Sequence, residues 1–260
     1  MQVIEAHGAR IPVIGLGTWE LRGRVCTRIV EQALRLGYRH IDTAQMYDNE
    51  RDVGEGLRMS GVPRSEVFVT TKVWPTHFAP PDLERSVRES VARLRLNAVD
   101  LLLLHWPSTR VPLAETLGAL AKVKREGLAR HIGVSNFDVG MMQQAVSLCP
   151  LPLVCNQIHY HPYFDQTALR QTCAAVGAAV VAYSPIAKGN VRGDTVLNEI
   201  GVRHNKTAAQ VALRWLVQQG VSAIPRTSRV ERLSENFSIF DFELTPAEMS
   251  EIFAIGAGHR

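Results

Sequence analysis

The sequence lacks the features that mark membrane, secreted and metal-binding proteins. No apolar run approaches the roughly 18 residues that span a bilayer, and the intense run Leu101–Leu104 is typical of a short buried strand. The N-terminus has no basic region followed by an apolar stretch, which predicts no secretory signal. The 4 cysteines show no CxxC spacing, and no His or Cys cluster has the spacing of a zinc site. We therefore expect a cytoplasmic protein with reduced thiols, no metal and no membrane association.

A strong charge excess is missing as well. The formal net charge is +4 and the pI is about 9.0, with basic residues spread along the chain. The densest basic group, Lys122–Arg125, lies in an expected helix and is typical of a solvated helix face. A nucleic-acid partner is therefore not expected, although a mild positive field would help an anionic cofactor to approach.

What the chain does contain is a regular alternation of short apolar, β-branched segments with longer segments of helical period. The expected strands are Val13–Leu16, His40–Thr43, Val67–Thr71, Val99–His105, His131–Ser135, Val154–Gln157, Ala178–Tyr183 and Val221–Ile224. The expected helices are Arg24–Leu36, Pro81–Leu94, Leu113–Arg125, Val139–Ser147, Gln166–Val176, Thr207–Gln219 and Val230–Ile239. Such alternation indicates parallel strands joined by helical crossovers.

The parallel strands could close into a barrel or form an open sheet. An open dinucleotide-binding sheet favours GxGxxG after its first strand, but the pair Gly15 and Gly17 is followed by Glu20 where the third glycine would stand. We therefore predict a single (β/α)8 TIM barrel occupying residues 1–260 as one domain, a size typical of this fold. Val3–Ile11 is expected to form a β-hairpin that plugs the barrel, and Ala247–Ile255 an extra C-terminal helix.

Reactive residues occur where several expected strands end, which is where the active site of such a barrel lies. Asp42, Lys72 and His105 end three strands, and Tyr47 follows Asp42 by five residues. A tyrosine is a weak acid at neutral pH, and a neighbouring ammonium such as Lys72 is expected to lower its pKa. Taken singly, each residue has an ordinary structural explanation, as a cap, a packed ring, a surface lysine or a core histidine.

Longer motifs carry a resemblance. The segments His40–Glu50, Thr71–Trp74, Leu103–Pro107, Gly133–Phe137, Asn156–Gln157 and Ile224–Thr227, with Arg232 and Glu235–Phe237, resemble in order and spacing the aldo-keto reductase superfamily. The likeness is greatest to small bacterial 2,5-diketo-gluconate and methylglyoxal reductases. It runs from Gly15 to about Phe237, which is nearly the whole chain.

This resemblance implies reduction of small aldehydes and ketones with NADPH, and it implies roles for matching residues. The catalytic set would be Asp42, Tyr47, Lys72 and His105. The cofactor would contact Ser135, Asn136, Gln157, Tyr183, Ser184, Ile186, Lys188, Arg226, Thr227, Arg232, Glu235 and Asn236. The substrate would meet His105 and walls made by Trp19, Trp74 and Trp106, with Phe78 as a further candidate. Many relatives have lysine where Arg226 stands, but a guanidinium still binds phosphate.

Two further expectations and two alternatives accompany this hypothesis. The short C-terminal segment predicts an open substrate site, and no exposed apolar stripe argues against a monomer.

One alternative is a metal-dependent hydrolase or isomerase barrel that uses His105, His159, His161 and Asp42. The other is a catalytically silent NADP(H)-binding barrel that acts as a redox sensor or a structural protein.

Overall fold

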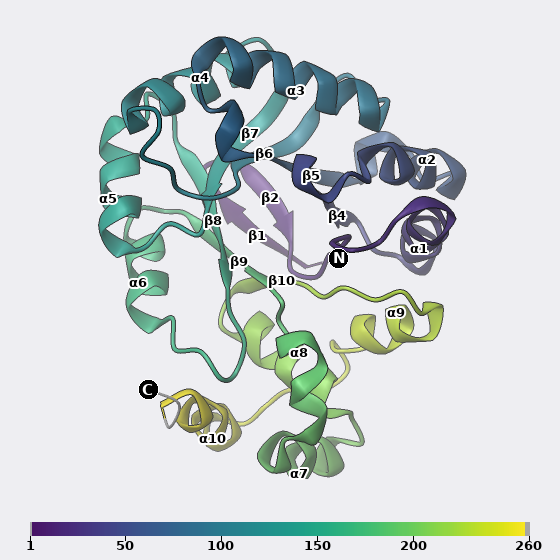
Figure 1. Ribbon diagram of the computed structural model, residues 1–260. Coiled ribbons are helices and arrows are strands. Elements are labelled where there is room, and N and C mark those ends of the chain that lie inside the picture. Colours follow the sequence, from purple (N-terminus) through teal and green to yellow (C-terminus); the bar gives the residue numbers. More distant parts are fainter. Residues whose placement is uncertain (1, 258–260) are drawn as a thin grey trace.

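The central feature of the protein is a sheet of eight parallel strands wound into a barrel, seen in a computed structural model that describes residues 2–257 (Figure 1). In spatial order, the strands are β3 (Leu16–Gly17), β4 (His40–Asp42), β5 (Phe68–Val73), β6 (Val99–Leu104), β7 (Ala129–Ser135), β8 (Leu153–His159), β9 (Ala179–Tyr183) and β10 (Val221–Ile224). A parallel bridge between Ile14 and Ala223 joins the two ends of this sheet. The predicted barrel is confirmed, although the strand expected at Val13–Leu16 is reduced to Leu16–Gly17 plus that bridge.

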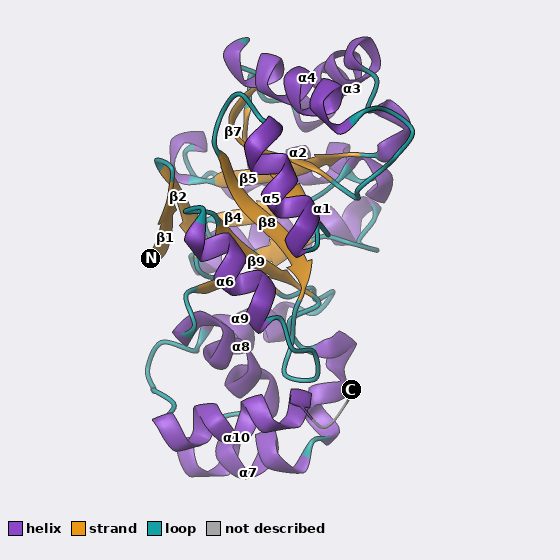
Figure 2. Ribbon diagram, turned by 90° about the vertical axis from the view of Figure 1, so that its left-hand side faces the viewer, coloured by secondary structure: helices purple, strands orange, loops and turns teal. Residues whose placement is uncertain are grey.

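Helices follow the strands along the chain and cover the outside of the barrel. They are α1 (Gly23–Leu36), α2 (Glu50–Ser60), α3 (Pro80–Leu94), α4 (Leu113–Arg125), α5 (Val139–Leu148), α6 (Thr167–Ala175), α7 (Thr195–His204), α8 (Ala208–Gln218), α9 (Val230–Phe237) and α10 (Pro246–Ala257). Short 3-10 turns are η1 (Gln45–Tyr47), η2 (Arg64–Glu66), η3 (Pro75–His77) and η4 (Ala187–Gly193). Figure 2 shows α7, α8 and α10 gathered at one end of the molecule. The extra C-terminal helix is present, and residues 258–260 of the C-terminal segment lie outside the described residues.

The sheet sorts its side chains into two apolar layers because successive residues of a strand point to opposite faces. In β6, Leu101 and Leu103 belong to the cluster inside the barrel, while Leu102 and Leu104 belong to the cluster beneath the helices. All four are fully buried. The run of leucines is therefore typical of a strand buried on both faces, as expected for parallel sheets.

A β-hairpin lies across one end of the barrel (Figure 1). It pairs β1 (Val3–Ala6) with β2 (Ala9–Pro12), and the turn residues His7 and Gly8 both have positive φ, as in the tight turns that fit twisted hairpins. Ala6, Ala9 and Ile11 join the inner apolar cluster of the barrel strands. The hairpin therefore plugs the barrel as predicted, and it leaves the opposite end for the site.

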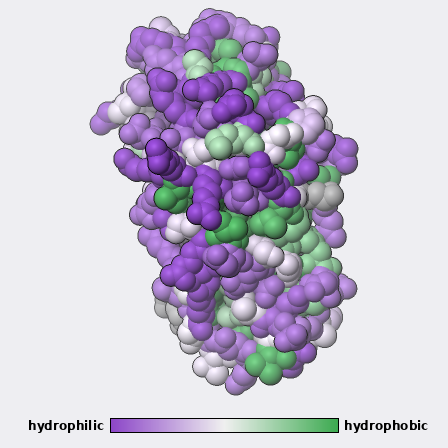
Figure 3. Space-filling view, turned by 90° about the vertical axis from the view of Figure 1, so that its right-hand side faces the viewer, coloured by the Kyte–Doolittle hydropathy of each residue, from purple (hydrophilic) through white to green (hydrophobic). Residues whose placement is uncertain are grey.

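Within residues 2–257, no helix combines the length and apolar character needed to cross a membrane. Figure 3 shows a side that is mainly hydrophilic, with hydrophobic side chains gathered in small groups near its middle.

Candidate active site

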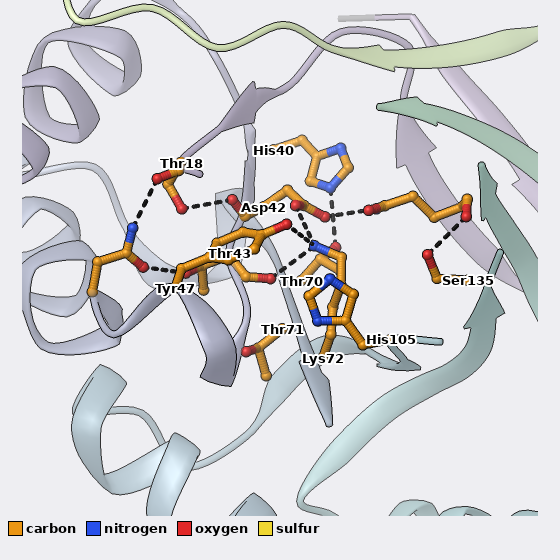
Figure 4. Close-up of polar contacts among 12 residues, drawn as sticks. Thr18, His40, Asp42, Thr43, Tyr47, Thr70, Thr71, Lys72, His105 and Ser135 are labelled. Carbon is orange, nitrogen blue, oxygen red and sulfur yellow. Dashed lines mark hydrogen bonds and ion pairs between the residues drawn. The ribbon is translucent and has the colours of Figure 1, made fainter. Parts of the chain in front are cut away.

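Four residues predicted from three motifs meet at the carboxyl end of the barrel (Figure 4). Asp42 ends β4, Lys72 lies near the end of β5, His105 directly follows β6, and Tyr47 ends η1. The Lys72 ammonium donates a short hydrogen bond to Asp42 Oδ1 and one of ordinary length, 2.9 Å, to the Thr43 carbonyl. It lies 3.5 Å from the Tyr47 hydroxyl, and the Tyr47 and His105 rings meet edge to face at 5.6 Å between centroids.

The charges of this group are balanced in a dry environment. Lys72 and Asp42 are 0% and 1% exposed, so each charge needs the other as a partner. Burial works against the charge of Lys72, but Asp42 and then Tyr47 raise its pKa overall. Burial raises the pKa of Tyr47, and the opposing effect of Lys72 is smaller. The expected net lowering of the Tyr47 pKa is therefore wrong, because burial of a side chain could not be read from the sequence. Lys72 does lower this pKa, but by less than burial raises it.

His105 is held neutral. Burial, and then the charge of Lys72, lowers its pKa to about 3. Its Nδ1 is buried and has no hydrogen-bond partner among the described residues. A neutral imidazole carries one N–H, so His105 is a hydrogen-bond donor at neutral pH rather than a cation. The ring of Trp74 packs edge-on against it at 5.1 Å.

Hydrogen bonds tie these residues to a neighbouring polar group. Gln157 donates from Nε2 to Asp42 Oδ2 at 2.7 Å, so both carboxylate oxygens of Asp42 are engaged. Ser135 donates to the Gln157 carbonyl, and Asn136 donates to the His105 carbonyl. Tyr183 in turn donates to Asn136 Oδ1 at 2.8 Å. The ends of β4 to β9 are therefore linked by one polar network.

A cavity of about 840 Å³ extends from this network toward a basic end. Sixteen of the predicted site residues line it: Trp19, Asp42, Tyr47, His105, Trp106, Ser135, Asn136, Gln157, Tyr183, Ser184, Ile186, Lys188, Arg226, Thr227, Arg232 and Asn236. Lys72 is buried next to Tyr47, and Trp74 packs against His105; neither is a lining residue. Glu235 accepts from Thr207 Oγ1 at 2.9 Å and is not a lining residue. Phe78 is buried in the core.

Several lining residues were not foreseen, including Met46, His159 and Arg192. His159 could have been found, since it follows Gln157 by two residues in β8 and so faces the same way. Its ring stacks on Tyr183 at 5.3 Å. Arg192 lies in the irregular turn η4, where no periodicity indicates which way a side chain points.

Several residues in the cavity walls have a left-handed backbone conformation. The lining residues Glu20, Asn136, Ser184 and Lys188 all have positive φ, which is uncommon for residues other than glycine. Such conformations cluster at functional sites, where the surrounding structure enforces them. Lys188 also lies over the Trp19 ring, 5.1 Å from its centroid, which connects η4 to the loop after β3.

The metal alternative finds no set of ligands in the part of the chain that the structure describes. Residues 2–257 contain no group of three or more His, Cys, Asp or Glu side chains arranged to hold a metal ion. His159 and His161 instead pack against each other, at 4.5 Å, and against Phe164.

Comparison with known proteins agrees with this geometry. The sequence profile described as "Aldo/keto reductase family" matches residues 13–257. The chain belongs to the aldo/keto reductase family. It is 41% identical over 250 residues to the 9,11-endoperoxide prostaglandin H2 reductase of Trypanosoma cruzi (strain CL Brener), covering 95% of this chain and 88% of the relative. It is 39% identical over 253 residues to the methylglyoxal reductase DkgB of Salmonella typhi, covering 96% and 95%.

Solved structures give the same result. The crystal structure of a protein assigned as a 2,5-diketo-D-gluconic acid reductase B superimposes with a TM-score of 0.96 at 49% identity, covering 98% of this chain and 91% of that one. The aldo/keto reductases are oxidoreductases, so this chain is an enzyme of that class. The relatives are named for chemically different substrates, so family membership alone does not choose one.

Proposed function

We propose that the protein reduces small aldehydes and ketones, dicarbonyls included, to alcohols with NADPH. The observation that carries the proposal is the contact of the Tyr47 hydroxyl with the Lys72 ammonium, beside the neutral ring of His105, at the inner end of the cavity. A proton donor and a hydrogen-bond donor there both face the space where a carbonyl oxygen would lie. The prediction that these residues are catalytic rests on this arrangement.

The cavity has the size and chemistry for a nicotinamide dinucleotide. Its volume of about 840 Å³ lies in the upper part of the roughly 300–1,000 Å³ range of small-molecule sites. Ser135, Asn136 and Gln157 supply hydroxyl and amide groups beside Tyr47, suited to a carboxamide. Arg226 and Arg232 supply positive charge at the other end, suited to phosphates. Arginine there favours NADPH over NADH, because only NADPH carries a 2′-phosphate.

The protein's part in the reaction is to position an oxygen and protonate it. A bound reduced nicotinamide supplies the hydride that reduces the carbonyl carbon. Tyr47 donates its hydroxyl proton to the carbonyl oxygen as negative charge develops there. An alkoxide is a stronger base than a phenolate, so a raised Tyr47 pKa does not prevent this transfer. Lys72, held by Asp42, stabilises the phenolate that remains, and His105 donates a hydrogen bond to the same oxygen.

The walls near Tyr47 indicate the kind of carbonyl that fits. Trp19, Met46 and Trp106 line the cavity, and these side chains are between 38% and 44% exposed. This open apolar rim suits small substrates of varied shape and gives few polar contacts for choosing among them. Methylglyoxal and 2,5-diketo-gluconate, named for two relatives, are the first compounds to assay.

The experiment that tests the proposal is the substitution Tyr47→Phe. We expect the turnover of methylglyoxal to fall by at least about 100-fold, because general acid catalysis contributes on that order. NADPH binding, measured by quenching of tryptophan fluorescence, is expected to be retained. Turnover like that of the wild type in this variant would refute the role of Tyr47. A wild-type protein that binds NADPH but turns over no carbonyl in a broad panel would favour the silent binding barrel.

The domain organisation, location and oligomeric state follow the same hypothesis. We propose one catalytic domain over residues 1–260, acting in the cytoplasm as a monomer. Gel filtration with light scattering tests the oligomeric state.

A further inference from the structure

The basic end of the cavity contains a residue that no motif identified. Arg192, from η4, lines the cavity together with Arg232 of α9. Its Nη2 lies 4.0 Å from Glu235 Oε2, so the side chain reaches across from η4 to α9. It is 40% exposed and thus free to meet a ligand from the cavity.

This end of the cavity holds more positive charge than its own carboxylate can balance. We call Arg192, Arg229 and Arg232 the arginine cluster, because Arg232 interacts with both of the others. Glu235 is an acidic neighbour of Arg192 and of Arg232. Burial and the like charges of Arg192 and Arg229 lower the pKa of Arg232, and Glu235 only partly opposes this. Glu235 also accepts a hydrogen bond from Thr207. Like charges held together in this way would be stabilised by a bound anion.

Arg226, one of the two arginines that the motifs assign to the phosphate, also makes contacts within the protein. Arg226 donates from Nε to the Trp19 carbonyl at 3.1 Å, and its Nη2 lies 3.8 Å from Glu20 Oε2. These contacts hold its guanidinium on the loop after β3. Arg226 and Arg232 both line the cavity, and Arg192 is a further cation on the wall beside Arg232.

We propose that Arg192 is a specificity-determining residue that grips the 2′-phosphate of NADPH together with Arg232, one guanidinium from η4 and one from α9. This inference rests on the proposed function, since it assumes that NADPH occupies the cavity. It makes η4 part of the recognition of the 2′-phosphate, in addition to the residues after β10 and in α9 that the resemblance assigns to that group. Two guanidinium groups, each a charged hydrogen-bond donor, suit a phosphate dianion.

The test compares ligands that differ in one phosphate. Dissociation constants of NADPH, NADH, 2′-AMP and 5′-AMP are measured by fluorescence or calorimetry for the wild type and for Arg192→Met. We expect the constants of NADPH and 2′-AMP to rise roughly 10- to 100-fold, as for loss of a charge-assisted hydrogen bond. Those of NADH and 5′-AMP are expected to stay unchanged. Arg192→Lys should recover part of the loss by keeping the charge.

The matched control is Arg229→Met, which removes the same charge from the arginine cluster at a residue that does not line the cavity. It is expected to weaken NADPH binding much less than Arg192→Met. Equal weakening of NADPH and NADH would place Arg192 at the pyrophosphate and overturn the inference, as would no change in either. Either of these results for Arg192→Met would leave the proposed function intact. A wild-type protein that binds neither NADPH nor NADH would instead refute the proposed function itself.

Discussion

Asn49 shows how a single side chain outside the catalytic group holds that group in place. It is 1% exposed and lies two residues after Tyr47. Its amide donates to the carbonyls of Thr18 and Leu21, at 2.8 and 2.9 Å, and accepts from Thr43 Oγ1 at 2.6 Å. These bonds fasten the loop that carries Tyr47 to the loop that follows β3.

Substituting Asn49→Leu keeps the approximate volume but removes the hydrogen bonds of the Leu21 carbonyl and the Thr43 hydroxyl, whereas the Thr18 carbonyl keeps one from the Leu21 amide. Each buried polar group without a partner costs about 1–3 kcal/mol, so we expect a loss of at least about 2 kcal/mol in the free energy of unfolding. Carbonyl turnover should fall as well, since Tyr47 loses its anchor. Urea unfolding measures the first effect. Asn97 is exposed, so Asn97→Leu is the control. Equal stability of the two variants would contradict the proposed anchoring role of Asn49.

At the same scale, the sequence predicted the residues that end strands better than those in loops. Asp42, Lys72 and His105 were found because strand ends converge at one end of a barrel. Trp74 was predicted to line the cavity, but it is not a lining residue and packs against His105. Arg192 was missed because an irregular turn has no period. The net direction of the Tyr47 pKa required a knowledge of burial that only the fold supplies.

Among the elements, α2 departs most from what its sequence predicts. Gly54 and Gly56 lie in its middle, where glycine is unfavourable by roughly 1 kcal/mol relative to alanine. The sequence analysis did not predict a helix in this segment. The structure explains both residues, since a Cβ on Gly54 would lie 2.4 Å from the Leu94 carbonyl oxygen, and one on Gly56 would lie 2.8 Å from the Thr27 carbonyl oxygen. The two glycines let α2 pack closely on the end of α3 and on α1.

We therefore expect Gly54→Ala to destabilise the protein although it raises helix propensity. The clash is with backbone, which cannot turn away as a side chain can, and overpacking of this kind costs typically about 1–3 kcal/mol. The control is Gly118→Ala in α4, where an added Cβ meets nothing within 4 Å, and it should stabilise by up to about 1 kcal/mol. Thermal unfolding compares the two. Shifts of the same sign would show that close helix packing is not the reason for Gly54.

Helix α7 was missed for a different reason. Its first turn is capped by Asp194, whose side chain accepts from the Leu197 amide at 2.9 Å. Its apolar residues are few, and Leu197, Ile200 and Gly201 are its buried residues. The strands were predicted from short apolar runs that are buried on both faces, and most helices from their helical period, each to within a few residues. Elements such as α2 and α7, which depend on tertiary contacts, were not.

Over the whole molecule, the barrel interior keeps imidazole rings neutral. His40 is fully buried in the barrel, and burial lowers its pKa to about 4 despite an opposing effect of Asp42. Its Nε2 is 3.0 Å from Thr70 Oγ1. His105, at the catalytic end, has its pKa lowered to about 3. Both rings take part in the fold only in the uncharged form, which links the stability of the barrel to pH.

The sign of this linkage follows from which state binds more protons. Between the unfolded value of about 6.5 and the folded values near 4 and 3, the unfolded chain binds protons at His40 and His105 that the folded chain does not. The free energy of unfolding should therefore rise with pH in this window and fall on acidification, by up to about 1.4 kcal/mol per pH unit for each ring. Urea unfolding at pH 7, 6 and 5 measures the slope. His40→Asn should lower the free energy of unfolding at every pH, and it should reduce the slope against pH by up to about 1.4 kcal/mol per pH unit. An unchanged slope would mean that His40 is not held neutral by the barrel.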